Sequence, residues 1–167
     1  MFTARAGRPS CSEVLPSLLI GAYPTQSDFA WLAEEHGITA VVSLQDDFDL
    51  AAKRLSPADL EACCRAIDLV YRRIGIPDGD VALLARELPA TVDLLQGLIA
   101  DGHRVYLHCN AGMNRAPTVA IAYLHVAQGH SIAEATHHVK ARRPCVPLIG
   151  ALRLAYGTGA ALRPRRR

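Results

Sequence analysis

The fold is decided by one stretch of sequence, His108-Cys109-Asn110-Ala111-Gly112-Met113-Asn114-Arg115-Ala116-Pro117-Thr118. Residues 104–107 just before it are predicted to form a short buried strand, and residues 116–128 a mostly apolar helix. In a strand–loop–helix turn of this kind, successive backbone N–H groups point at one spot, and the helix dipole adds positive potential there. The stretch therefore predicts an anion pocket.

Two side chains give this predicted pocket its chemistry. Cys109 stands at the start of the loop, where the pKa of a thiol falls from about 8.5 to well below neutrality, so we expect a thiolate. Arg115 has a planar guanidinium that can bind two phosphate oxygens at once. Arg115 stands six positions after Cys109, and none of the other four cysteines has an arginine at this distance. The pattern predicts phosphoryl transfer to cysteine, the alternative being an inert buried thiol. The predicted phosphate-binding residues are Asn110, Ala111, Gly112, Met113, Asn114 and Arg115.

Composition limits the class of protein. At 167 residues the chain has the length of about one domain, and its net charge of +2 is too small to imply a nucleic acid partner. No apolar run approaches the roughly 18 residues of a membrane span. The odd number of cysteines, without a Cys-x-x-Cys pair, argues against a disulfide framework and a zinc ribbon. We expect a cytoplasmic monomer that needs neither a metal nor a cofactor.

Strands and helices alternate along the chain. Apolar runs predict strands at residues 18–21, 40–44, 68–74 and 104–107. Capping residues, prolines and glycines predict helices near residues 25–37, 56–66, 81–99, 116–128, 131–143 and 148–156. The acidic residues 45–50 are predicted to form a loop. This order predicts an α/β fold, with a mainly parallel central sheet of four to five strands flanked by helices.

The chain is expected to form one catalytic domain, over residues 14–157. An irregular N-terminal arm, 1–13, precedes it, and a basic tail, 158–167, follows. Ligands of such sheets bind beyond the carboxyl ends of the strands, which is where Cys109 falls.

A cysteinyl-phosphate reaction also needs an acid for the leaving oxygen, and later a base for water. The loop Asp78-Gly79-Asp80 follows a strand and should lie at the same sheet edge as Cys109. Asp78 is the first candidate for this acid. Asp80 is the second, although capping the following helix is its more natural role.

The order of these motifs, with the acid ahead of the cysteine, resembles the dual-specificity branch of the cysteine-dependent protein tyrosine phosphatase superfamily. The loop 109–117 is most similar to that of the glucan phosphatases, the group of laforin and the plant starch phosphatases. Further similarity to the plant enzymes lies in residues 44–50 and 142–147. Asn114 departs from the glucan loop, which has a second glycine there, and Gly79 replaces an aromatic residue of the plant enzymes.

The resemblance implies a dual-specificity phosphatase fold and a phosphomonoester hydrolase. It implies Cys109 as nucleophile, Arg115 as phosphate clamp and Asp78 as general acid, with His108 as a structural histidine and Asp80 in support. The implied partner is a phosphorylated substrate, either a phosphoprotein or a phosphorylated polysaccharide. A non-catalytic module that binds phosphorylated partners is the alternative from another class.

Overall fold

A five-stranded sheet forms the centre of the computed structural model, which describes residues 7–160. Its strands follow the order β1-β2-β5-β3-β4. The strands β2, β5, β3 and β4 run parallel, and β1 pairs antiparallel with β2. This confirms the predicted mainly parallel sheet. The bounds are β1 Cys11–Leu15, β2 Leu18–Gly21, β3 Ala40–Ser43, β4 Val70–Arg73 and β5 Val105–His108.

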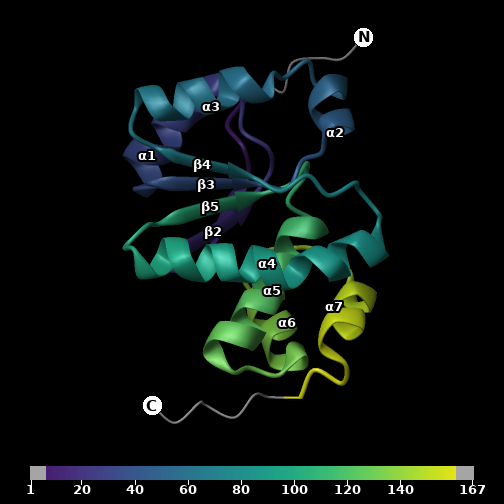
Figure 1. The fold of residues 1–167 in the computed structure, drawn as a ribbon. Helices are drawn as coiled ribbons and strands as arrows, with labels where there is room; N and C mark the ends of the chain where they lie inside the picture. The colour runs from purple at the N-terminus through teal and green to yellow at the C-terminus, as the bar shows by residue number, and fades with distance from the viewer. Residues whose placement is uncertain (1–6, 161–167) are drawn as a thin grey trace.

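Helices cover both faces of this sheet (Figure 1). On one face lie α1 (Phe29–His36) and α3 (Pro57–Ala66), and on the other lie α4 (Val81–Ala100) and α5 (Arg115–Gln128). The last two helices form an outer layer, with α6 (Ile132–Lys140) packed on α5 and α7 (Ile149–Tyr156) packed on α4. A helix is found at each predicted position, except that a 3-10 turn, η1 (Gln26–Asp28), precedes α1 and that α6 ends at Lys140 instead of residue 143.

Two hydrophobic cores form because successive strand residues point to opposite faces of a sheet. In β5, Val105 and Leu107 join the core beneath α4 and α5, whereas Tyr106 joins the core beneath α1 and α3. The same alternation occurs in β3, where Val42 and Val41 point to opposite sides. All four β5 residues are buried. The strand that leads into residues 109–115, called the signature loop below, is therefore held rigidly.

The register of the sheet places the signature loop at its carboxyl edge. His108, the last residue of β5, is paired with Gly21 of β2 on one side and with Ser43 of β3 on the other. Cys109 therefore leaves the sheet between the ends of two parallel neighbours. This is the position at which open α/β sheets bind their ligands.

One predicted loop is a helix. The acidic residues 45–50 were expected to be irregular, but α2 (Asp47–Ala52) begins inside them. The reason is a capping box: the Asp46 carboxylate accepts from the backbone N–H of Asp49 at 2.8 Å, and the Asp49 carboxylate accepts from the N–H of Asp46 at 3.2 Å. Helix α2 lies beyond the carboxyl ends of the strands (Figure 1).

The predicted ends of the domain also need correction. Residues 11–13 were assigned to an irregular arm, but they belong to β1, because Cys11 pairs with Gly21 and so adds an antiparallel strand to the sheet. Of the predicted basic tail, residues 161–167 lie outside the described residues, as do residues 1–6 of the arm. The start of the tail is attached to the domain, since the Gly159 carbonyl accepts from the N–H of Ile132 at 2.8 Å.

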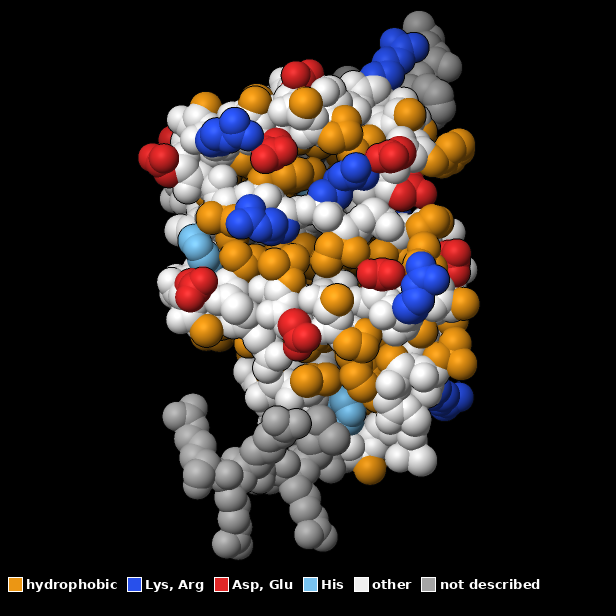
Figure 2. Space-filling view, viewed as in Figure 1, with side chains coloured by type: hydrophobic (Ala, Val, Ile, Leu, Met, Phe, Trp, Pro, Cys, Tyr) orange, Lys and Arg blue, Asp and Glu red, His pale blue; other side chains and the backbone are white. Residues whose placement is uncertain are grey.

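The surface is mixed in charge. Figure 2 shows acidic and basic side chains interspersed on one face, with apolar side chains between them. A search of the helices within residues 7–160 finds none with the length and apolar character that a membrane crossing requires.

Candidate active site

Cys109 and Arg115 are both buried at the carboxyl edge of the sheet. Cys109 follows β5 directly and is 3% exposed, and Arg115 is the first residue of α5 and is 1% exposed. Their positions depend on two rigid elements, a fully buried strand and a helix whose first eleven residues are buried. The loop between them is short, and its course is fixed at both ends.

The backbone of this loop is polarised. The carbonyl oxygens of residues 109–114 all accept hydrogen bonds from outside the pocket or from the first turn of α5; their donors are His108, Tyr23, Arg143, Val146 and Thr118. In contrast, the amide N–H groups of residues 110–114 have no acceptor anywhere in residues 7–160. A row of open amides at a helix start is therefore suited to an oxyanion.

Arg143 fastens the outer side of the loop. Its Nε donates to the carbonyl of Gly112 at 2.7 Å, and its Nη2 donates to the carbonyl of Ala111 at 2.9 Å. The same guanidinium reaches Ser10 at 3.0 Å and Ser12 at 3.3 Å. Because the carbonyls of Ala111 and Gly112 are turned outward to Arg143, the N–H groups of the same segment are free to face inward. From the sequence alone, Arg143 was expected only to be the last residue of a helix.

Residue 146 fixes the next part of the loop. The N–H of Val146 donates to the Met113 carbonyl at 2.8 Å, and the Asn114 side-chain amide donates to the Val146 carbonyl at 2.9 Å. Asn114, which replaces a glycine of the glucan signature, thus connects the rim of the loop to the segment between α6 and α7. Residues 142–147, noted for their similarity to the plant enzymes, are in this way part of the support of the loop.

The guanidinium of Arg115 is held along one edge. Its Nη1 lies 2.6 Å from Asp49 Oδ2, 2.6 Å from the Ile76 carbonyl oxygen and 3.3 Å from the Leu44 carbonyl oxygen. The other two nitrogens, Nε and Nη2, are buried and have no hydrogen-bond partner among the described residues. Two adjacent unpaired donors on a planar fork match the bidentate geometry with which arginine binds phosphate.

Asp78 approaches this free edge. Its Oδ1 lies 3.5 Å from Arg115 Nε, a distance typical of an ion pair but too long for a good hydrogen bond. The Asp78 side chain is largely exposed, so it can be reached by a substrate. Asp80 has a different role, because its Oδ1 accepts from the N–H of Leu83 at 2.8 Å and caps α4. Asp78 therefore lies next to Arg115, whereas Asp80 is the N-cap of α4.

Asp49 is the member of the site that the sequence missed. It was grouped with the solvated acidic residues 45–50, but it is only 6% exposed and forms a buried ion pair with Arg115. Its other oxygen accepts from the Asn110 side chain at 2.6 Å, and Gln45 donates to Asn110 at 2.8 Å. The spacing Asp46-x-x-Asp49, a capping box, was the available signal, since it predicts a helix there.

His108 is fully buried and uncharged near neutral pH. Burial lowers its pKa to about 4, and the nearby Arg115 charge acts in the same direction, while the hydrogen bond to the Cys109 carbonyl partly offsets both. Its Nδ1 donates to that carbonyl at 3.1 Å, and its ring stacks on Tyr106 with centroids 5.8 Å apart. Both contacts fit the structural part that the resemblance implied.

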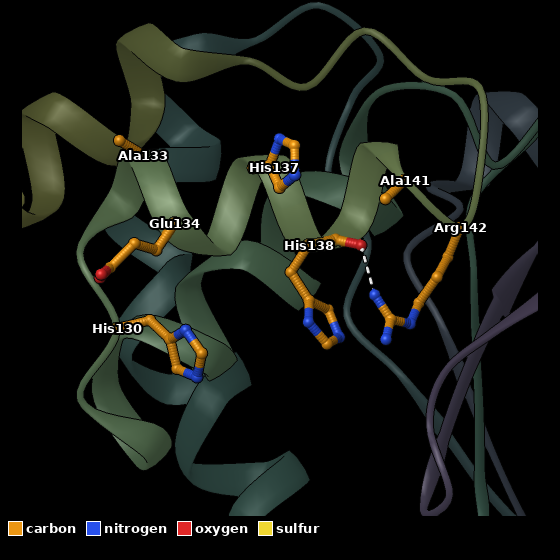
Figure 3. A pocket seen from close by; sticks show the side chains of 7 residues that line it. All are labelled: His130, Ala133, Glu134, His137, His138, Ala141 and Arg142. Atoms are coloured by element: carbon orange, nitrogen blue, oxygen red, sulfur yellow. Dashed lines mark hydrogen bonds between the residues drawn. The ribbon is translucent and has the colours of Figure 1, made fainter.

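A separate hollow of about 580 Å³ lies on α6 and is lined by His130, Ala133, Glu134, His137, His138, Ala141 and Arg142 (Figure 3). Three of its polar side chains form hydrogen bonds within the fold. Glu134 accepts from the N–H of Ser131 at 2.7 Å, His138 Nε2 donates to the Val14 carbonyl at 2.8 Å, and Arg142 donates to the His138 carbonyl at 3.0 Å. Nowhere in residues 7–160 do three metal-ligating side chains come together.

The family model described as "Dual specificity phosphatase, catalytic domain" matches residues 18–151. Laforin of Mus musculus is 28% identical over 146 residues, which cover 81% of this chain and 44% of laforin. The amyloplastic phosphoglucan phosphatase DSP4 of Castanea sativa is 28% identical over 144 residues, which cover 85% of this chain and 38% of that protein.

A solved structure agrees with these matches. The crystal structure of a mouse putative dual specificity phosphatase complexed with zinc tungstate has a TM-score of 0.70 and 26% sequence identity to this chain, covering 95% of this chain and 92% of that one. The chain spans less than half the length of laforin and of the Castanea sativa phosphoglucan phosphatase. The matched region contains β2 to β5 and the whole signature loop, and the fold agrees over nearly the full domain. The chain therefore belongs to the dual specificity phosphatase family.

Proposed function

We propose that this protein is a phosphomonoester hydrolase of the dual-specificity protein tyrosine phosphatase type, acting through a cysteinyl-phosphate intermediate and without a metal. The observation that carries the proposal is the polarity of the loop 109–115. The carbonyls of residues 109–114 accept hydrogen bonds, whereas the amides of residues 110–114 and two Arg115 nitrogens have no acceptor among the described residues. Such an array stabilises the charge that develops on a transferring phosphoryl group.

The reaction proceeds in two steps. Cys109 Sγ attacks phosphorus, and the bond to the leaving oxygen breaks as Asp78 gives that oxygen its proton. Asp78, now a carboxylate, then removes a proton from water, whose oxygen attacks phosphorus and releases Cys109 as a thiolate with inorganic phosphate. Arg115 and the amides hold the equatorial oxygens in both steps.

The test uses para-nitrophenyl phosphate in the presence of a chelator. We expect hydrolysis in the wild-type protein that orthovanadate inhibits. Cys109→Ser should abolish turnover but retain binding of the anion, and Asp78→Asn should lower the rate. Asp78→Asn should also change the shape of the pH profile, because Asp78 carries a proton in both steps. Full activity of Cys109→Ser would falsify the proposal.

A phosphorylated protein is the first proposed substrate, and a phosphorylated polysaccharide is the second. The second is supported by the similarity to laforin and to a phosphoglucan phosphatase, and by Phe48, which is 80% exposed on α2 beside Asp49. An exposed aromatic ring can stack on a sugar. The experiment compares phosphate release from phosphopeptides and from phosphorylated amylopectin.

The comparison of substrates is repeated with Phe48→Ala. If a polysaccharide is the substrate, this variant should lose activity on amylopectin and keep its activity on para-nitrophenyl phosphate. Leu154→Ala is the matched control, because Leu154 is also largely exposed but lies on α7. Equal losses in the two variants would remove the argument for a stacking contact.

A binding module without turnover is the competing function, and it would bind phosphorylated partners with no release of phosphate. We further propose a monomer that acts in the cytoplasm and binds neither nucleic acid nor membrane. The five cysteines, all free, suit a reducing compartment. The mixed charge of the surface in Figure 2 offers no broad basic area on the described part of that face for a nucleic acid. Sedimentation and size-exclusion measurements test the monomer.

A further inference from the structure

Asp49 is the only acidic residue of α2 that points into the protein. Its neighbour Asp47 has a side chain that is 87% exposed and pairs with Arg73 at the surface, at 2.9 Å. Asp49 instead lies 2.6 Å from Arg115 Nη1 with one oxygen and 2.6 Å from Asn110 Nδ2 with the other. One carboxylate thus joins the last and the first residue of the proposed phosphate loop.

The environment of Asp49 keeps it ionised. Burial raises the pKa of its carboxyl group, but hydrogen bonds from Arg115 and Asn110 outweigh burial and lower the pKa below 3.8, its ordinary value. Both oxygens also accept hydrogen bonds within the protein. A carboxylate in this state is a poor proton donor, and so Asp49 is unsuited to be the general acid.

The ion pair fixes the orientation of the Arg115 fork. A guanidinium is planar, and three acceptors converge on the single nitrogen Nη1: Asp49 and the carbonyls of Leu44 and Ile76. Nε and Nη2 are left open. Because the side chain is planar, holding Nη1 also sets the direction in which these two nitrogens point.

We propose that Asp49 is a positioning residue for phosphoryl transfer, which sets the Arg115 fork and the Asn110 end of the loop before substrate binds. The inference rests on the function proposed above. A group that is oriented in advance costs no reorganisation during the reaction. Helix α2 also carries Phe48 on its exposed side, so the helix that would meet a substrate is the one that holds the phosphate-binding arginine.

The test compares Asp49→Asn with Asp47→Asn. Both variants remove one negative charge from the same helix, but only the first changes a contact of Arg115. We expect Asp49→Asn to lower kcat/KM for para-nitrophenyl phosphate about 100-fold and to weaken orthovanadate binding about tenfold, whereas Asp47→Asn stays within about twofold of wild type. Where Asp49→Asn remains active, its pH profile should keep the shape of the wild type, because Asp49 moves no proton.

Folding and anion binding are measured separately from turnover. Circular dichroism gives the temperature range in which each variant is folded, and Asp49→Ser replaces Asp49→Asn if the latter does not fold. Orthovanadate binding is measured by calorimetry. An inactive wild-type protein would defeat the proposed function, while the vanadate affinities of the two variants would still decide the role of Asp49.

Two results would overturn the inference. One is a folded Asp49→Asn protein that matches Asp47→Asn in both kcat/KM and vanadate affinity. The other is the loss of one limb of the pH profile in Asp49→Asn, which would make Asp49 a proton carrier instead of a positioning residue.

Discussion

The Nε atom of Arg143 lies 2.7 Å from the carbonyl oxygen of Gly112, so a residue beyond the end of α6 holds the middle of the signature loop. Arg143 is 6% exposed and forms four hydrogen bonds, two of them to loop carbonyls. A guanidinium presents its donors in a rigid planar fork, whereas the three donors of an ammonium group rotate on a flexible stem. The orientation of the loop amides therefore depends on this side chain.

Arg143→Lys should reduce activity through the loop. The ammonium group keeps the charge but leaves loop carbonyls unpaired, so kcat/KM should fall roughly 10- to 100-fold and the free energy of unfolding should fall by about 1–3 kcal/mol. Steady-state kinetics and denaturant unfolding measure the two effects. Arg142→Lys is the control, because Arg142 is exposed and, among the described residues, its side chain bonds only the His138 carbonyl of α6. Equal kinetics of the two variants would argue against the support that Arg143 gives.

Gly112→Ala should damage the loop for steric reasons. Gly112 has a φ of +66°, and a Cβ there would lie 2.5 Å from the Gly21 carbonyl carbon and 2.6 Å from Arg143 Nη2. We expect a loss of about 1–3 kcal/mol in stability and a large loss of activity. Gly97→Ala in α4 is the control, because nothing lies within 4 Å of its added Cβ, and it should stabilise the protein by up to about 1 kcal/mol. Thermal unfolding and para-nitrophenyl phosphate hydrolysis measure the two losses. A Gly112→Ala protein with wild-type stability and activity would contradict the steric argument.

His108 should make stability depend on pH. Its pKa is lowered from 6.5 to about 4 in the folded protein, so between these values the unfolded chain binds the proton more tightly. Stability is therefore complete above 6.5 and decreases as the pH falls toward 4, by about 3 kcal/mol over the full shift. Denaturant unfolding across this range measures the slope. In His108→Asn, whose side chain does not titrate, that part of the slope should vanish even if the protein is less stable overall, and an unchanged slope would assign it to other groups.

Asp80→Ala separates the two acidic residues of the loop before α4. It removes the cap of that helix, so stability should fall by about 1 kcal/mol. The pH profile of hydrolysis should keep the wild-type shape, in contrast to Asp78→Asn. A profile that changes shape in Asp80→Ala would make Asp80 the proton donor, and the roles of the two residues would have to be exchanged.

The parts of this molecule that depend on neighbouring residues could be predicted from the sequence. The strand, loop and helix around Cys109 are continuous in the chain, and Asp78 could be placed because parallel strands end at one edge of the sheet. The helix starts at residues 25, 56 and 131 could be predicted, because each N-cap depends on a contact with the residue three positions later.

The parts that were missed depend on partners far apart in the chain. Asp49 is separated from Arg115 by 66 residues and Arg143 from Ser10 by 133, and no local pattern indicates such pairs. A run of carboxylates is usually solvated, and an arginine before a proline usually ends a helix. Only the folded sheet brings these charged groups into contact with the loop and makes their burial possible.

The antiparallel strand β1 has a practical consequence for anyone who shortens this protein. A fragment that starts at residue 14, the boundary suggested by the sequence, or at residue 18, where the family match starts, would retain every residue proposed to contact phosphate. It would nevertheless lack the hydroxyl groups of Ser10 and Ser12, which hold the far side of the Arg143 guanidinium. A fragment meant to keep the Arg143 contacts should therefore begin at or before Ser10.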